Sequence, residues 1–132
     1  STFTNKNYVL EKVDFCLGQV GLIEANNQPV ASLSHGDCRK LEIAMALASD
    51  AKLLLLDEPM AGLGPSETQE MISLLNKLKG KQTILLVEHD MDAVFALADR
   101  ISVLVSGEII ATGEPNNIRR DSKVQKAYLG EA

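Results

Sequence analysis

Two adjacent carboxylates, Asp57 and Glu58, directly follow the short apolar run 53–56. Such a run predicts a buried parallel strand, and both acids would lie at its exposed carboxyl end. One acid could hold a Mg²⁺ ion, mostly through water, while the next polarises a water that attacks a phosphoryl group. Apolar runs that end in acids also occur in strands without a catalytic role, so the pair alone leaves both interpretations open.

A second candidate lies at residues 33–37, Leu-Ser-His-Gly-Asp, where the pattern predicts the start of a helix. Ser34 suits an N-cap, and Asp37 stands three residues on, where a capping box places its carboxylate. The N–H groups at a helix N-terminus bind phosphate readily, and Gly36 would let a nucleotide approach the backbone closely. Without further context, a capped helix that binds no ligand is the commoner interpretation.

His89 is the third candidate, and it directly follows a second apolar run at 83–87. A neutral imidazole in this place could hydrogen-bond a γ-phosphate and orient the attacking water. A single histidine at the start of a helix more often has no special role. His89 therefore gains weight only in combination with the other two candidates.

The elements that must position these residues alternate between helix and strand. Periodicity predicts helices over 8–23, 34–49, 66–79 and 90–98, buried strands over 53–56 and 83–87, a hairpin of 101–105 and 108–111 around Ser106-Gly107, and further helices as far as 129. This alternation is typical of an α/β fold with a parallel sheet. Chemistry gathers at the carboxyl ends of parallel strands, where Asp57, Glu58 and His89 are expected.

Composition narrows the class of protein. The 132 residues carry a net charge of −5, which argues against non-specific binding to nucleic acid. Cys16 and Cys38 do not form a CxxC pair, so a zinc site is not expected. The start STFTNKN is polar, unlike a signal peptide, and apolar runs are too short to span a bilayer.

The candidates occur together in one order, and in this combination the chain resembles the ATP-binding-cassette (ABC) ATPases from about Tyr8 onward. LSHGD looks like the signature motif, LLLLDEP like the Walker B strand with its catalytic glutamate, AGLG like the D-loop and His89 like the switch histidine. The runs LEIAMALA, DEPMAGLGP, VEHDMDAV and AYLGEA are similar to cassettes of branched-chain amino-acid importers. Urea-type importer cassettes and the cassette of lipopolysaccharide export look related at the same places.

The resemblance implies a partial P-loop NTPase (ABC ATPase) fold, with a parallel β-sheet core flanked by helices and a C-terminal β-hairpin. Residues 1–50 would be the end of a helical subdomain, and 51–132 the end of the ATPase core. The chain would lie at the cytoplasmic face of the membrane, without a span of its own. Its partners would be integral membrane permease subunits and a second cassette, which closes head to tail around ATP and Mg²⁺.

The resemblance also implies a role for each motif residue. Glu58 would be the general base, His89 would hold the γ-phosphate and Asp57 would help to hold Mg²⁺. The signature would contact ATP bound to the other cassette, through Ser34, His35, Gly36 and Asp37. The D-loop would contact the other cassette itself, through Ala61, Gly62, Leu63 and Gly64.

Several departures from the family pattern qualify these expectations. The sequence contains no GxxxxGK[ST] run, the loop that cradles phosphates, so we expect roughly the first half of a cassette to be missing and the chain alone to be inactive. His35 stands where the signature usually has glycine, which fits the importer branch. Asp37 replaces a usual glutamine, and Gly64 stands where many cassettes have aspartate, which puts the usual D-loop contact in doubt.

Other interpretations stay open. DNA-repair, chromosome-associated and ribosome-acting ATPases also carry the signature, although neither a coiled-coil arm nor a tandem cassette is visible here. The chain could be a non-catalytic module that donates its signature helix to a complete cassette, or an inactive remnant. An α/β domain whose motifs match by accident is the remaining alternative, and four motifs in order make it improbable.

Overall fold

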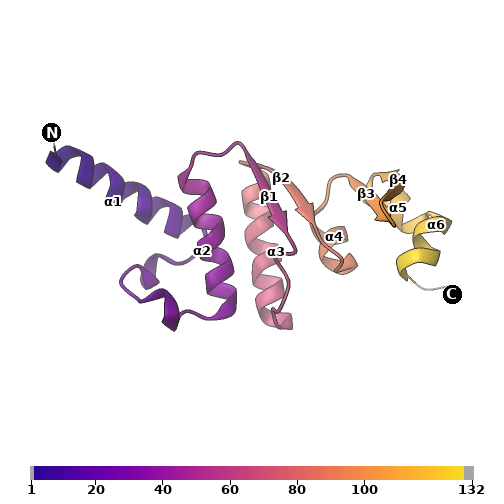
Figure 1. Ribbon diagram of the computed structural model, residues 1–132, viewed down its shortest axis with the longest axis horizontal. Coiled ribbons are helices and arrows are strands. Elements are labelled where there is room, and N and C mark those ends of the chain that lie inside the picture. Colours follow the sequence, from indigo (N-terminus) through magenta and orange to yellow (C-terminus); the bar gives the residue numbers. More distant parts are fainter. Residues whose placement is uncertain (1, 130–132) are drawn as a thin grey trace. The chain divides into compact units, whose positions relative to one another are not determined.

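A computed structural model describes residues 2–129 of the chain, which falls into two compact units, Ser1–Glu88 and His89–Ala132. In order along the first unit lie α1 (Thr2–Gln19), two short 3-10 turns (Ile23–Ala25 and Val30–Ser32), α2 (His35–Ala48), β1 (Leu53–Asp57), α3 (Pro65–Lys79) and β2 (Thr83–Val87) (Figure 1). The predicted subdomain boundary after residue 50 concerns a complete cassette and stays a prediction.

Helix α1 ends earlier than the apolar spacing suggested. Gly21 adopts a φ of 76°, a left-handed conformation that glycine accepts without a steric penalty. The Leu22 N–H then donates back to the Leu17 carbonyl at 2.8 Å, which closes the helix end. The prediction of a helix is therefore confirmed, but its last turn is replaced by a glycine cap.

Strands β1 and β2 pair in parallel, in a register that sets Leu53 opposite Thr83 and Asp57 opposite Val87 (Figure 1). The prediction that both strands are buried is wrong for one face of this sheet. Leu54 is 2% exposed, whereas Leu55 and its cross-strand partner Leu85 are 69% and 58% exposed. Side chains alternate between the faces of a strand, and among the described residues only the face that carries Leu54 is covered.

Helix α3 supplies much of the core of the first unit. Its apolar positions recur at helical spacing and are all buried, at Met71, Leu74, Leu75 and Leu78. Gly64 precedes the helix, Pro65 occupies its first turn, and Gly80 caps its end. The sequence prediction of this helix is confirmed to within one residue at its start.

The second unit contains α4 (Met91–Leu97), β3 (Ile101–Val105), β4 (Glu108–Gly113), α5 (Pro115–Arg120), α6 (Ser122–Val124) and a π-helical turn (Gln125–Leu129). The predicted hairpin is confirmed: β3 and β4 are antiparallel, and Ser106 and Gly107 both have positive φ, as a type I′ turn requires. A small core joins the hairpin to the last helices, formed by Ile101, Val103, Ile118 and Val124. The last three residues of the run AYLGEA lie outside the described residues.

None of the described helices is both long and apolar enough to cross a membrane.

Candidate functional site

The predicted N-cap of α2 is present. The Ser34 hydroxyl accepts a hydrogen bond from the Asp37 N–H at 3.1 Å, and the Ser34 carbonyl accepts from the Cys38 N–H at 2.9 Å. Gly36, in the first turn, is buried. This end of α2 carries N–H groups without partners in the helix, together with the positive end of its dipole, so its chemistry suits an anion.

The side chain of His35 contacts the β1–α3 loop, residues 58–64, within the same chain. Its Nε2 lies 3.2 Å from the carbonyl oxygen of Ala61. Gly62 has a φ of 77°, and a Cβ added to it would lie 2.9 Å from His35 Nε2. A glycine at position 62 therefore serves both the turn and the close approach of the imidazole.

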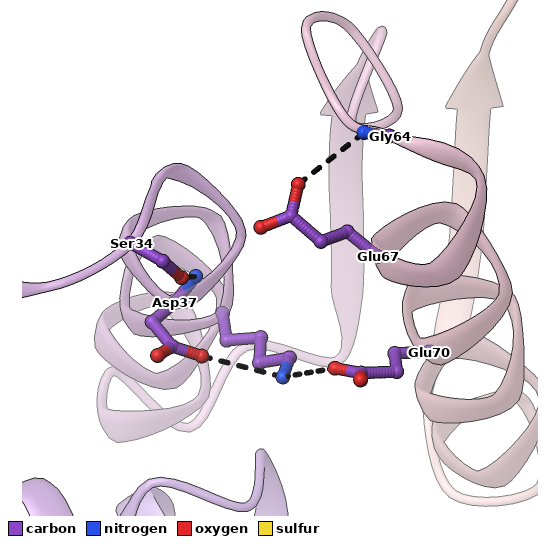
Figure 2. Close-up of polar contacts among 6 residues, drawn as sticks. Ser34, Asp37, Gly64, Glu67 and Glu70 are labelled. Carbon is purple, nitrogen blue, oxygen red and sulfur yellow. Dashed lines mark hydrogen bonds and ion pairs between the residues drawn. The ribbon is translucent and has the colours of Figure 1, made fainter.

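Gly36 receives a side chain from α3 in a similar way. A Cβ on Gly36 would lie 2.9 Å from Glu67 Oε1. Glu67 Oε2 accepts a hydrogen bond from the Gly64 N–H at 3.3 Å, as Figure 2 shows. Glu67 is not among the site residues that the sequence predicted. Its signal was present, because a glutamate two residues after a proline at a helix start suits the carboxylate of a capping box.

An ion-pair network ties the same two helices together. Lys40 Nζ lies 3.3 Å from Asp37 Oδ1 and 2.9 Å from Glu70 Oε2 (Figure 2). Partial burial acts to lower the pKa of Lys40, but its hydrogen bonds to Glu70 and Asp37 outweigh this effect and raise the pKa above its ordinary value. The negative charge that Asp37 brings to the start of α2 is thus paired with a cation.

The carboxylate pair lies at the end of β1, as predicted, and Glu58 has an unusual backbone. Its φ is 47°, a left-handed value that is uncommon for residues other than glycine. The Glu58 N–H donates to the Val87 carbonyl at 2.7 Å, and the Glu58 carbonyl accepts from the Ala61 N–H at 3.0 Å. Sparsely populated backbone conformations of this kind persist where neighbouring contacts hold them, and they cluster at functional sites.

Glu88 is a further residue that contacts the β1–α3 loop and is not among the predicted site residues. Its Oε2 accepts a hydrogen bond from the Met60 N–H at 3.3 Å, so a side chain that follows β2 holds the β1–α3 loop. The contact joins residues that are 28 apart in sequence. No local sequence pattern predicts such a long-range contact.

The residues of the first unit suit a cation that keeps most of its water ligands better than one held by protein ligands alone. The Asp57 side chain is exposed, and it makes no hydrogen bond or ion pair with the described residues. Among these residues, no cluster of three or more His, Cys, Asp or Glu could hold a metal ion. Mg²⁺ usually keeps several waters and takes one or two carboxylates plus phosphate oxygens, so a single free aspartate fits it.

His89 belongs to the second unit, where it is exposed and precedes α4. Asp90 caps that helix, because its Oδ1 accepts from the Ala93 N–H at 3.1 Å. A position at the end of β2, just before a helix, matches the sequence prediction. That His89 joins Asp57 and Glu58 in one site stays a prediction.

Comparison with known proteins gives these features a context. The ABC transporter family matches residues 2–61, and a family of branched-chain amino acid ATP-binding cassette transporters matches residues 108–132. The high-affinity branched-chain amino acid transport ATP-binding protein LivG of Escherichia coli (strain K12) is 43% identical over 125 residues, which are 93% of this chain and 49% of LivG. The lipopolysaccharide export system ATP-binding protein LptB of Haemophilus influenzae is 32% identical over 122 residues, 92% of this chain and 51% of LptB.

A solved structure supports the same assignment. MJ1267, an ATP-binding cassette of an ABC transporter in its ADP conformation, superposes with a TM-score of 0.81 at 33% identity, over 92% of this chain and 50% of that protein. The chain belongs to the ABC ATPase family, and its fold matches about half of a cassette. It spans about half the length of the curated relatives it matches, and its sequence is similar to the branched-chain amino acid members.

Proposed function

We propose that this chain forms part of the ATP-hydrolysing subunit of an ABC transporter that imports branched-chain amino acids. One observation carries the catalytic part of the proposal: Glu58 is held in a left-handed conformation at the end of β1, next to the unpaired carboxylate of Asp57. The 43% identity to LivG over 93% of the chain supports the substrate class.

The three predicted residues that follow the strands have separate roles in this proposal. Glu58 accepts a proton from the water that attacks the γ-phosphate, and its fixed backbone limits the positions that its carboxylate can take. Asp57 binds Mg²⁺ through water, and the ion, when bound, offsets negative charge on the phosphate oxygens. His89 donates a hydrogen bond to the γ-phosphate.

The start of α2 serves a different ATP molecule, one held by a second cassette arranged head to tail. The Ser34 hydroxyl and the N–H groups around Gly36 donate to its γ-phosphate. Lys40 pairs with Asp37 and so reduces the repulsion between that carboxylate and the phosphate. The dimer would close around ATP and open again after hydrolysis. This cycle, at the cytoplasmic face of the membrane, would drive the permease subunits between their conformational states.

The 132 residues alone are proposed to be inactive, because no GxxxxGK[ST] loop is present to cradle the phosphates. Titration calorimetry of the chain with ATP and Mg²⁺, paired with a phosphate-release assay, tests this. We expect no heat of binding at micromolar protein and no turnover. Tight binding, or turnover that Glu58→Gln abolishes, would show that the chain has a phosphate site of its own.

A composite cassette tests the proposed function directly. In E. coli LivG, the 125 matched residues are exchanged for those of this chain, and leucine uptake is measured in cells that lack LivG. We expect uptake to be restored, and to be lost again with Glu58→Gln in the same composite. A composite made in LptB is the matched control for substrate class. Restored lipopolysaccharide export without restored leucine uptake would overturn the assignment to amino-acid import.

A further inference from the structure

We propose that His35 is a positioning residue for Glu58 and acts through the peptide of Ala61. The inference rests on the proposed role of Glu58 as general base. It assigns to the imidazole of His35 a task inside its own chain, where the motif alone suggested a contact with ATP on another cassette. The task is to hold the β1–α3 loop in the one conformation that fixes Glu58.

The first step is the contact between the ring and the loop. His35 Nε2 lies 3.2 Å from the Ala61 carbonyl oxygen. A carbonyl can only accept, so the ring must donate, which requires the Nε2-protonated tautomer or the imidazolium. The imidazole also fills the space beside Gly62, where a Cβ would come within 2.9 Å of Nε2. The loop and the ring therefore fit each other without room for another side chain.

The second step leads from Ala61 to Glu58. The Ala61 N–H donates to the Glu58 carbonyl at 3.0 Å, and the Glu58 N–H donates to the Val87 carbonyl at 2.7 Å. Glu58 is thus held on both sides of its left-handed Cα. A conformation of this kind costs free energy and persists only where its surroundings enforce it. His35 holds Ala61, and Ala61 holds Glu58.

The other contacts between α2 and α3 do not reach this part of the loop. Lys40 joins Asp37 to Glu70. Glu67 fills the space beside Gly36 and accepts a hydrogen bond from the Gly64 N–H at the far end of the loop. These contacts set the spacing of the helices. The His35 side chain, in contrast, hydrogen-bonds to the turn that carries the carbonyl of Glu58.

The activity test uses the composite cassette and separates kcat from KM. For His35→Ala we expect kcat for ATP hydrolysis to fall about tenfold, while KM changes by no more than about twofold. The expected loss of kcat is larger than the loss of one hydrogen bond causes and smaller than the loss that a misplaced catalytic group causes. His35→Gln places an amide N–H near the position of Nε2 and should recover most of kcat. Met45→Ala, an exposed substitution on the same helix, is the control and should leave both constants unchanged.

The possible outcomes differ in what they overturn. If the parent composite hydrolyses no ATP, the proposed function itself fails. If the parent is active and His35→Ala raises KM while kcat is kept, the ring contacts nucleotide and does not position Glu58. If the glutamine variant is as slow as the alanine variant, a hydrogen bond to Ala61 is not the cause.

¹⁵N NMR of the 132-residue chain, labelled with ¹⁵N at its histidines, tests the contact between His35 and Ala61 directly. We expect His35 to be protonated at Nε2 at pH 8, with its signal assigned by its loss in His35→Gln. Gly62→Ala adds a Cβ against the ring and should shift that signal. A ring protonated at Nδ1, or a signal indifferent to Gly62→Ala, would overturn the inference whatever the composite does.

Discussion

At the scale of single residues, two glycines define how the site is built. Gly36 and Gly62 each lie where a Cβ would come within 2.9 Å of a side chain from the other segment, Glu67 Oε1 and His35 Nε2 respectively. The sequence predicted the glycine of the signature from its motif, and the N-cap Ser34 from its position. It could not predict these partners, because they lie 26 or more residues away and no local pattern pairs them.

Ser34→Ala removes the side-chain cap of α2 and should lower the free energy of unfolding by about 1 kcal/mol. Ser34→Gly should cost only a few tenths of that amount, since glycine leaves the cap N–H groups open to water. Urea denaturation followed by circular dichroism measures both. Ser66→Ala, at the exposed start of α3, is the matched control and should change stability by less than about 0.5 kcal/mol. Equal losses in the Ser34 and Ser66 variants would contradict the capping role.

At the scale of elements, the periodicity of the sequence located the helices and strands, but it placed the end of α1 too late and misjudged the burial of the strands. The run 53–56 was predicted to be buried on both faces because it is wholly apolar. One face is instead exposed. A wholly apolar strand indicates that both of its faces are suited to burial, but it does not indicate which residues pack against each face. The link between α2 and α3 through Lys40 could not be predicted from the sequence either, because Glu70 is 30 residues away.

Lys40→Met tests that link between the helices. We expect the free energy of unfolding to fall by about 1 kcal/mol, because two carboxylates lose a half-buried cation. The pKa of Lys40 is raised, so its pairing contributes fully below the ordinary lysine pKa and is lost only as pH rises through the higher folded value. The loss should therefore be the same at pH 7 and pH 9.

Urea midpoints at the two pH values measure this effect. Lys6→Met, on the exposed surface of α1, serves as the control. A cost that disappears at pH 9 would show that Lys40 titrates near neutrality and would contradict the raised pKa.

At the scale of the whole molecule, the sheet of β1 and β2 has one apolar face that the described residues leave exposed. Leu53, Leu55, Leu85 and Val87 share that face, because paired residues of a parallel sheet point the same way. The chain spans about half the length of relatives such as LivG. Apolar patches of this kind are usually covered in a complete protein, and uncovered ones associate.

We therefore expect the 132-residue chain to self-associate through this face. The double variant Leu55→Thr/Leu85→Thr should weaken the association at least about tenfold, because two exposed leucines leave the contact. Sedimentation velocity over a range of concentrations measures it. Leu104→Thr removes an equally exposed leucine from the second unit and should have little effect. A wild-type chain that stays monomeric at high concentration would contradict this expectation.

The most direct measurement of the central claim is ATP turnover by the composite cassette with and without Glu58→Gln. If Glu58 is the general base, the amide should lower kcat by at least about 100-fold while ATP binding stays within a few-fold of the parent. Turnover within a few-fold of the parent, with binding intact, would show that the end of β1 is not the catalytic centre and would contradict the account.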